Sequence, residues 1–77
     1  MKWVPVRWGN EQYEWIQTAS GRWSMLGHEA EVFHTARGWG VMVQGKFLSY
    51  YRTRKQAMEA AIGYLAYEKR RREAEVG

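Results

Sequence analysis

The spacing of the apolar residues changes once along the 77-residue chain, at Thr53. Before this residue, apolar side chains recur at every second position, as in Trp39, Val41 and Val43, and this alternation is typical of half-buried β-strands. After it, the apolar residues recur with the period of an α-helix and fall on one stripe. That stripe consists of Met58, Ala61, Ile62 and Leu65, with Ala57 and Tyr64 along its flank. The pattern predicts a run of strands followed by one helix.

Thr53 and Gln56 mark the start of that helix. They form a T-x-x-Q capping box, in which each side chain can satisfy a free amide of the first helical turn. The apolar stripe ends near Tyr67, and the residues that follow alternate in charge and pair at i,i+4. We therefore predict a helix over about 54–73 that extends past the body of the domain. The basic run 69–72 spreads around this helix end as on a solvated surface, with contact to phosphate as the alternative.

Six segments before Thr53 have the alternation of strands: 3–8, 11–18, 22–26, 30–36, 39–44 and 47–51. Turns are expected at Gly9-Asn10, Ser20-Gly21, Arg37-Gly38 and Gly45-Lys46. Pro5 cannot donate a ladder hydrogen bond, so the first strand is expected at a sheet edge. The predicted fold class is α+β, an antiparallel sheet of five or six short strands followed by one C-terminal helix.

We expect residues 1–77 to form a single small domain. Residues 1–27 would make an aromatic hairpin or meander, and residues 30–73 a strand-strand-strand-helix unit. A helix roughly 10 Å in diameter covers about three strands spaced near 4.8 Å apart. Part of the sheet, or its whole second face, is therefore expected to stay uncovered, and aromatic side chains there need a partner or must pack on one another.

The composition limits what can stabilise the fold and where in the cell the protein is expected. It has no cysteine, so neither disulfides nor thiolate metal sites can support the fold, whereas aromatic residues make up 16% of it. No apolar run is long enough to span a membrane, and the amino terminus lacks the apolar region of a secretory signal. We expect a cytoplasmic protein without membrane association. The net charge is +4, and residues 52–77 hold seven basic and four acidic side chains.

No enzyme signature is present in the sequence. His28 and His34 have no cysteine near them, and the alternation of a strand prevents the intervening glutamates from converging with them on a metal. The chain contains neither a phosphate-binding loop nor a Gly-x-Ser-x-Gly elbow, and it has no aspartate. We therefore expect no catalytic activity, no metal, no cofactor and no small-molecule substrate.

Aromatic residues next to basic ones are the stronger clue to function. The pairs are Arg22 with Trp23, Arg37 with Trp39, and Tyr50-Tyr51 with Arg52. Rings interleaved with Arg and Lys on a sheet face can stack on nucleic-acid bases. The competing interpretation is that the rings form the core, although Tyr50 and Tyr51 must point to opposite faces, so that one of them lies outside.

The junction between the last strand and the helix is the best candidate for an anion site. Arg52, Arg54 and Lys55 cluster there, beside the free amides of the helix amino terminus.

Residues 36–65 also resemble a known family. The order Arg-Gly-Trp-x-Val-x-Val-x-Gly-Lys, then Ser-Tyr-x-Arg-Thr-Arg-Lys-Gln-Ala and a helix, is similar to the amino-terminal arm-binding domains of phage-type tyrosine recombinases (integrases). The plant ethylene-response-factor DNA-binding fold shares the three strands and the helix. In such domains the sheet lies in the major groove, and the resemblance implicates Arg37, Trp39, Lys46, Tyr50 and Arg52. Residues 1–27 lie outside the resemblance.

Two functional hypotheses follow, and either suits a small phage or mobile-element regulator. The first is a non-enzymatic module that binds DNA or RNA. Its contact residues would be Arg37, Trp39, Lys46, Tyr50, Arg52, Arg54 and Lys55. The second is a protein-interaction module that uses the uncovered aromatic face to form a homodimer or to inhibit a host protein. Its interface would include Trp3, Tyr13, Trp15 and Trp23. A basic rim around the exposed rings would favour nucleic acid, and a neutral or acidic rim would favour protein.

Overall fold

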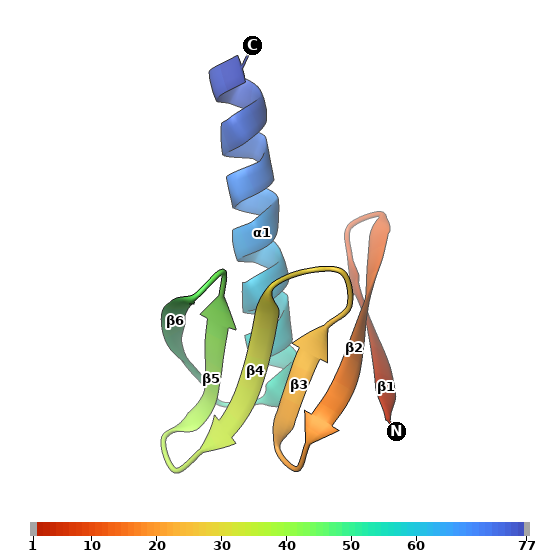
Figure 1. Ribbon diagram of the computed structural model, residues 1–77, viewed down its shortest axis with the longest axis vertical. Helices are drawn as coiled ribbons and strands as arrows, with labels where there is room; N and C mark the ends of the chain where they lie inside the picture. The colour runs from red at the N-terminus through yellow and green to blue at the C-terminus, as the bar shows by residue number, and fades with distance from the viewer. Residues whose placement is uncertain (1, 77) are drawn as a thin grey trace.

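A computed structural model describes residues 2–76 as an antiparallel sheet of six strands followed by one long helix (Figure 1). The strands are β1 (Trp3–Trp8), β2 (Glu11–Ala19), β3 (Arg22–Met25), β4 (Ala30–Thr35), β5 (Gly38–Val43) and β6 (Lys46–Tyr51). The helix α1 spans Arg54–Val76. The predicted α+β class and order of elements are confirmed.

The strands are ordered β1-β2-β3-β4-β5-β6, so each pairs with its neighbours in sequence. Pro5 lies in β1, the edge strand where its missing N–H is tolerated, as predicted. Two turns begin one residue earlier than expected, at Ala36 and at Gln44. Gln44 and Gly45 both have positive φ, 52° and 79°, which is the geometry of a type I′ hairpin turn.

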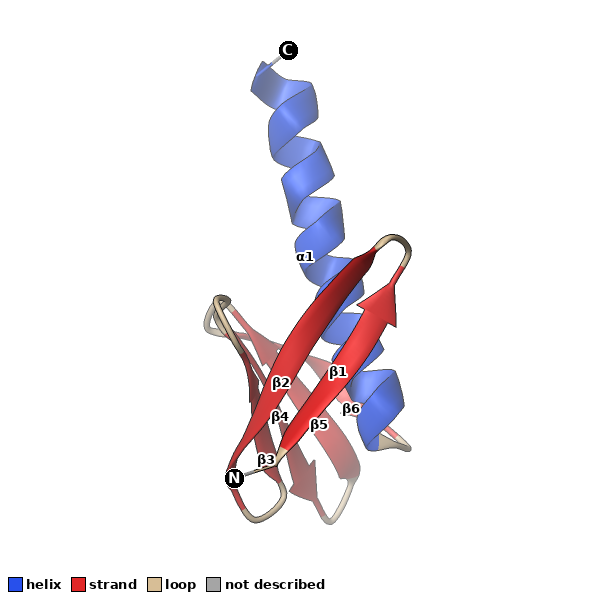
Figure 2. Ribbon diagram, turned by 90° about the vertical axis from the view of Figure 1, so that its right-hand side faces the viewer, coloured by secondary structure: helices blue, strands red, loops and turns tan. Residues whose placement is uncertain are grey.

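The sheet curls around the first half of the helix (Figure 2). The helix contacts both edge strands, β1 and β6, as well as β4 and β5. Trp8 of β1 and Tyr51 of β6 border the same groove beside Gly63. The expectation that one helix covers about three strands is therefore wrong, because strand twist brings the two edges of the sheet toward the helix from opposite sides.

The hydrophobic core lies between the helix and the inner, concave face of the curled sheet. The predicted helix stripe supplies Met58, Ala61 and Ile62, and its flank supplies Ala57. The sheet supplies Val6, Trp15, Trp23, Met25, Ala30, Val32, Val41 and Val43. The outer, convex face is not covered by any element of the described chain. The expected uncovered second face thus exists.

The helix begins where the sequence places it. The Gln56 backbone N–H donates to Thr53 Oγ1 at 3.2 Å, which satisfies one amide of the first turn as predicted for the capping box. The helix runs to Val76, three residues beyond the predicted end. Its second half projects past the sheet and gives the molecule a longest dimension of 42 Å (Figure 1). No helix among the described residues has the length and apolarity to cross a membrane.

Candidate nucleic-acid interface

The meander topology brings distant parts of the sequence to two opposite ends of the sheet. The start of β1, the β2–β3 turn, the β4–β5 turn and the β6–α1 connection lie at one end, which we call the basal end (Figure 1). It comprises residues 2, 19–22, 35–38 and 51–55. The other three connections and the projecting half of the helix lie at the opposite, upper end.

The basal connections contact one another directly. The His34 backbone N–H donates to the Gly21 carbonyl at 2.7 Å, which joins the β2–β3 turn to the end of β4. Gly38 lies against the Tyr51 backbone, next to the β6–α1 connection. The Arg54 guanidinium lies 4.5 Å from the centroid of the Trp23 ring, so the start of the helix is held against β3.

The charge of the basal end has one sign. It holds six of the twelve Lys and Arg residues and no acidic residue: Lys2, Arg22, Arg37, Arg52, Arg54 and Lys55. Four of the six side chains are exposed and make no ion pair with a carboxylate in the described chain, namely Lys2, Arg37, Arg52 and Lys55. Unpaired, hydrated cations of this kind are available to bind phosphate.

The other two basal cations are engaged within the protein. Arg22 Nε lies 3.1 Å from Glu31 Oε1. Arg54 is half-buried, and its guanidinium lies over the Trp23 ring. Arg22 and Arg54 therefore help to hold the structure of the basal end. Arg52 and Lys55, close to Arg54 in the sequence, are two of the four unpaired cations.

The helix amino terminus adds to the positive potential of the basal end. Its first turn contains no acidic residue to offset the helix dipole. Thr53 satisfies the amide of Gln56, and the free amides before it lie among Arg52, Arg54 and Lys55.

Six of the seven residues predicted to contact nucleic acid lie at the basal end or directly above it, although not all on one face of the sheet. Arg37, Arg52, Arg54 and Lys55 belong to the basal end, and Trp39 and Tyr50 lie in the strands directly above it. Lys46 lies apart from them, at the upper end of β6.

Trp39 and Tyr50 occupy opposite faces of the sheet. Trp39 is paired with Tyr51 on the concave face, where it is half-buried and its ring lies 4.9 Å from that of His34. Tyr50 is on the convex face and is 40% exposed. The sequence required one of the two tyrosines to lie outside, and the structure identifies Tyr50 as that residue.

Lys2 and Arg22 were absent from the predicted set. The sequence pattern pairs Arg22 with Trp23, and Lys2 precedes the first strand. Both join the basal end because alternate connections of a meander meet at the same edge. The antiparallel order of the strands contains the signal, because every second connection then lies at the same end of the sheet. Assigning each connection to an end in this way would have placed Lys2 and Arg22 with the other basal residues.

The proposed protein-interface residues are divided by the fold. Trp15 and Trp23 are buried, at 0% and 3% exposed, so their assignment to an interface is wrong and both belong to the core. Period-two alternation shows which residues share a face but leaves open which face the helix covers. Tyr13 is half-buried at the upper end, and Trp3 is exposed on β1.

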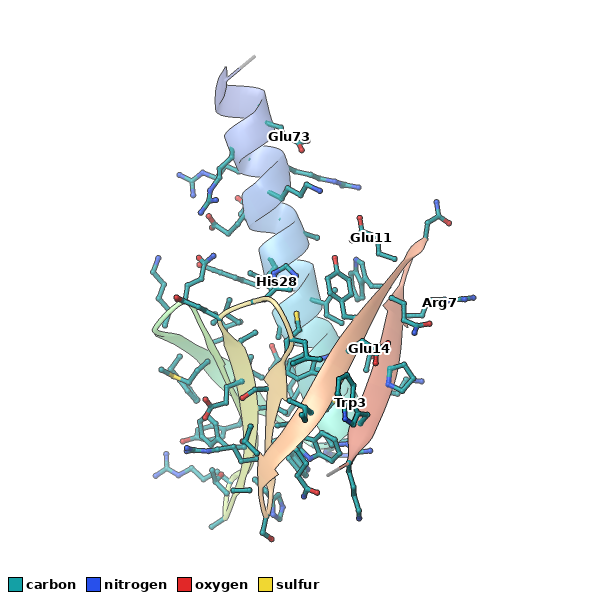
Figure 3. All side chains as sticks on the ribbon, turned by 45° about the vertical axis from the view of Figure 1, so that its right-hand side comes forward. Trp3, Arg7, Glu11, Glu14, His28 and Glu73 are labelled. Carbon is teal, nitrogen blue, oxygen red and sulfur yellow. The ribbon has the colours of Figure 1, made fainter. Side chains whose placement is uncertain are left out.

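The upper end mixes charges of both signs. Figure 3 labels three of its residues, namely Glu11 at the β1–β2 hairpin, His28 between β3 and β4, and Glu73 near the end of the helix. They line a groove together with Glu68, Lys69 and Arg72. The Tyr13 hydroxyl donates to Glu11 Oε2, and this hydrogen bond, helped by partial burial and the carboxylate charge, raises the pKa of Tyr13 above its ordinary value. This end offers no surface of uniform positive charge.

Among the described residues, no group of three or more histidine and acidic side chains gathers as a metal site would require. Comparison of the chain with protein-family models, with curated proteins and with solved structures finds no match. The resemblance of residues 36–65 to integrase arm-binding domains therefore stays a prediction.

Proposed function

We propose that this chain is a small, non-enzymatic nucleic-acid-binding module whose basal end holds the phosphate backbone. The observation that carries the proposal is the gathering of six basic side chains and no acidic one on connections that are far apart in sequence. Four of these side chains are unpaired and exposed within the described chain. Electrostatic contact with phosphates supplies most of the sequence-independent affinity of nucleic-acid-binding proteins.

The spread of these charges favours a polymer over a small anion. Arg22 begins β3, Arg37 lies between β4 and β5, and Arg52 follows β6. With neighbouring strands about 4.8 Å apart, these positions span roughly 14 Å along the sheet. Arg22 is paired with Glu31, so Arg37 and Arg52 are the unpaired cations along this line, and Lys2, before β1, is a third at the opposite edge of the sheet. Cations placed on separate connections in this way suit successive phosphates along a strand better than one small anion.

The test measures binding of the protein to a short labelled duplex and to a labelled single strand of the same sequence. Fluorescence anisotropy reports the binding at about 50 and 200 mM salt. We expect binding that weakens steeply as salt increases. The double variant Arg52→Ala/Lys55→Ala should bind more weakly at low salt and reduce the magnitude of the log–log salt slope by up to about 2, since each lost phosphate contact removes about 0.7–0.9. Arg54 is left intact because it packs on Trp23.

The matched control is Arg70→Ala/Arg72→Ala, at the upper end of the molecule. Both double variants lower the net charge of +4 by two, so they differ only in where the charge is lost. The control should keep most of the affinity and of the salt slope. Equal losses in the two variants would show that net charge alone drives binding, and no binding at low salt would refute the proposal.

A further inference from the structure

Three aromatic side chains form a continuous patch on the convex face of the sheet, which we call the aromatic platform: Phe33, Phe47 and Tyr50. The ring centroids of Phe47 and Tyr50 are 4.9 Å apart, and those of Phe33 and Phe47 are 6.5 Å apart. Phe47 is 46% exposed and Tyr50 is 40% exposed. No element of the described chain covers these rings.

The platform is held in place by its neighbours. Gly40 lies beneath the Phe33 ring, so close that a Cβ at position 40 would be 2.6 Å from Phe33 Cε2. The ring can lie flat across the strand only because residue 40 has no side chain. The Arg22 guanidinium also lies near this ring, 5.9 Å from the Phe33 centroid. A ring held as Phe33 is loses little further freedom when a ligand stacks on it.

The charge around the platform suits a nucleic acid on its basal side. Tyr50 is separated from Arg52 by one residue, and Phe33 is paired across the sheet with Arg22. Glu31, a carboxylate two residues before Phe33 on the same face of β4, is neutralised by Arg22 at 3.1 Å. Tyr50 therefore adjoins an unpaired cation of the basal end, Arg52, and Phe33 adjoins the ion pair of Arg22 with Glu31.

We propose that the aromatic platform stacks unpaired bases of a single-stranded nucleic acid whose phosphates are held by the basal end. This inference rests on the proposed function and adds that the nucleic acid is single-stranded. Stacking on aromatic side chains is worth about 1–3 kcal/mol per base and tolerates any sequence, since every base has a π-face.

The side chains of the convex surface favour stacking on the flat faces of bases over hydrogen bonding to their edges. In a duplex the base faces are covered by their neighbours, and a protein reads hydrogen-bonding groups on the edges in the grooves. The platform presents two phenylalanine rings, a tyrosine ring and, beside them, the apolar Met42 side chain paired across from Phe47. Such a surface gains more from bases that are unstacked and open.

The test compares three labelled ligands of equal length: an oligothymidylate strand, the same backbone with abasic sites in place of the bases, and a duplex. Wild-type protein should bind the oligothymidylate at least about tenfold more tightly than the abasic strand, since stacking of one base supplies about that factor. The double variant Phe47→Ala/Tyr50→Ala should lose this preference and keep its affinity for the abasic strand. The control Tyr67→Ala removes an exposed ring on the projecting helix and should bind like wild type.

The outcomes separate this inference from the proposed function. Equal binding of the abasic and base-containing strands, or tighter binding of the duplex, would overturn the platform inference and leave the proposed function standing. Absence of binding to all three ligands would overturn both. A dimer in sedimentation that Phe47→Ala/Tyr50→Ala dissociates, with ligand preference unchanged, would assign the platform to a second copy of the chain. The abasic comparison uses wild-type protein, so it stays decisive if the double variant fails to fold.

Discussion

Gly38 fixes the relative position of two basal connections. Its φ is +117°, and a Cβ at this position would lie 2.6 Å from the Tyr51 carbonyl oxygen. That oxygen belongs to the backbone directly before Arg52, so it cannot rotate away as a side chain would. The close approach of Gly38 therefore holds the β4–β5 turn, with Arg37, beside the β6–α1 connection.

Replacing Gly38 by alanine should destabilise the fold and separate these two connections. The matched variant is Gly45→Ala, at a turn residue with φ of +79° and nothing within 4 Å of its Cβ position. Both variants carry the strain of a positive φ, about 1–2 kcal/mol near the left-handed helical region and more at the +117° of Gly38. Gly38→Ala should lose at least about 1 kcal/mol more, because the backbone contact must also be relieved. Urea unfolding measures both free energies, and an equal loss in the two variants would contradict this role of Gly38.

The separate elements were largely predictable because local patterns determine them. Alternation of apolar residues located the strands, Pro5 identified an edge, and Thr53 placed the helix start. The curl of the sheet was not predictable, since it depends on twist accumulated over six strands and on packing against the helix. Because the curl decides which face of the sheet the helix covers, the sequence could not show that Trp15 faces the core. It also could not show that Phe33, Phe47 and Tyr50 form the platform.

The contact between β1 and the helix leads to a prediction for Gly63. A Cβ at this position would lie 3.4 Å from the Trp8 ring, an ordinary van der Waals distance. Gly63→Ala should therefore be accommodated and should raise the free energy of unfolding by about 0.5–1 kcal/mol, the difference in helix propensity. The reverse change at a neighbouring helix position, Ala60→Gly, should lower it by a similar amount. Thermal and urea unfolding report both changes, and a loss of stability in Gly63→Ala would show that the helix packs more tightly on Trp8 than described.

At the scale of the whole molecule, the fold separates charge that the sequence intermixes. Arg22, Arg37 and Arg52 are about fifteen residues apart, and the meander returns each of them to the basal end. The cluster Arg52, Arg54 and Lys55 could be predicted because it is local. Its union with Lys2, Arg22 and Arg37 could not be seen without the strand order, which also places Lys46 at the other end.

The most direct test of the account is to map the bound ligand on the protein. Titration of labelled protein with a short single strand, followed in an amide nitrogen–proton correlation spectrum, uses glycine amides as reporters of position. Gly21 and Gly38 lie at the basal end, and Gly9, Gly27 and Gly45 lie at the upper end. We predict shifts of Gly21 and Gly38 that saturate with the ligand, with little change at the upper glycines. Shifts confined to the upper glycines, or equal shifts at both ends, would contradict the assignment of the basal end as the nucleic-acid-binding site.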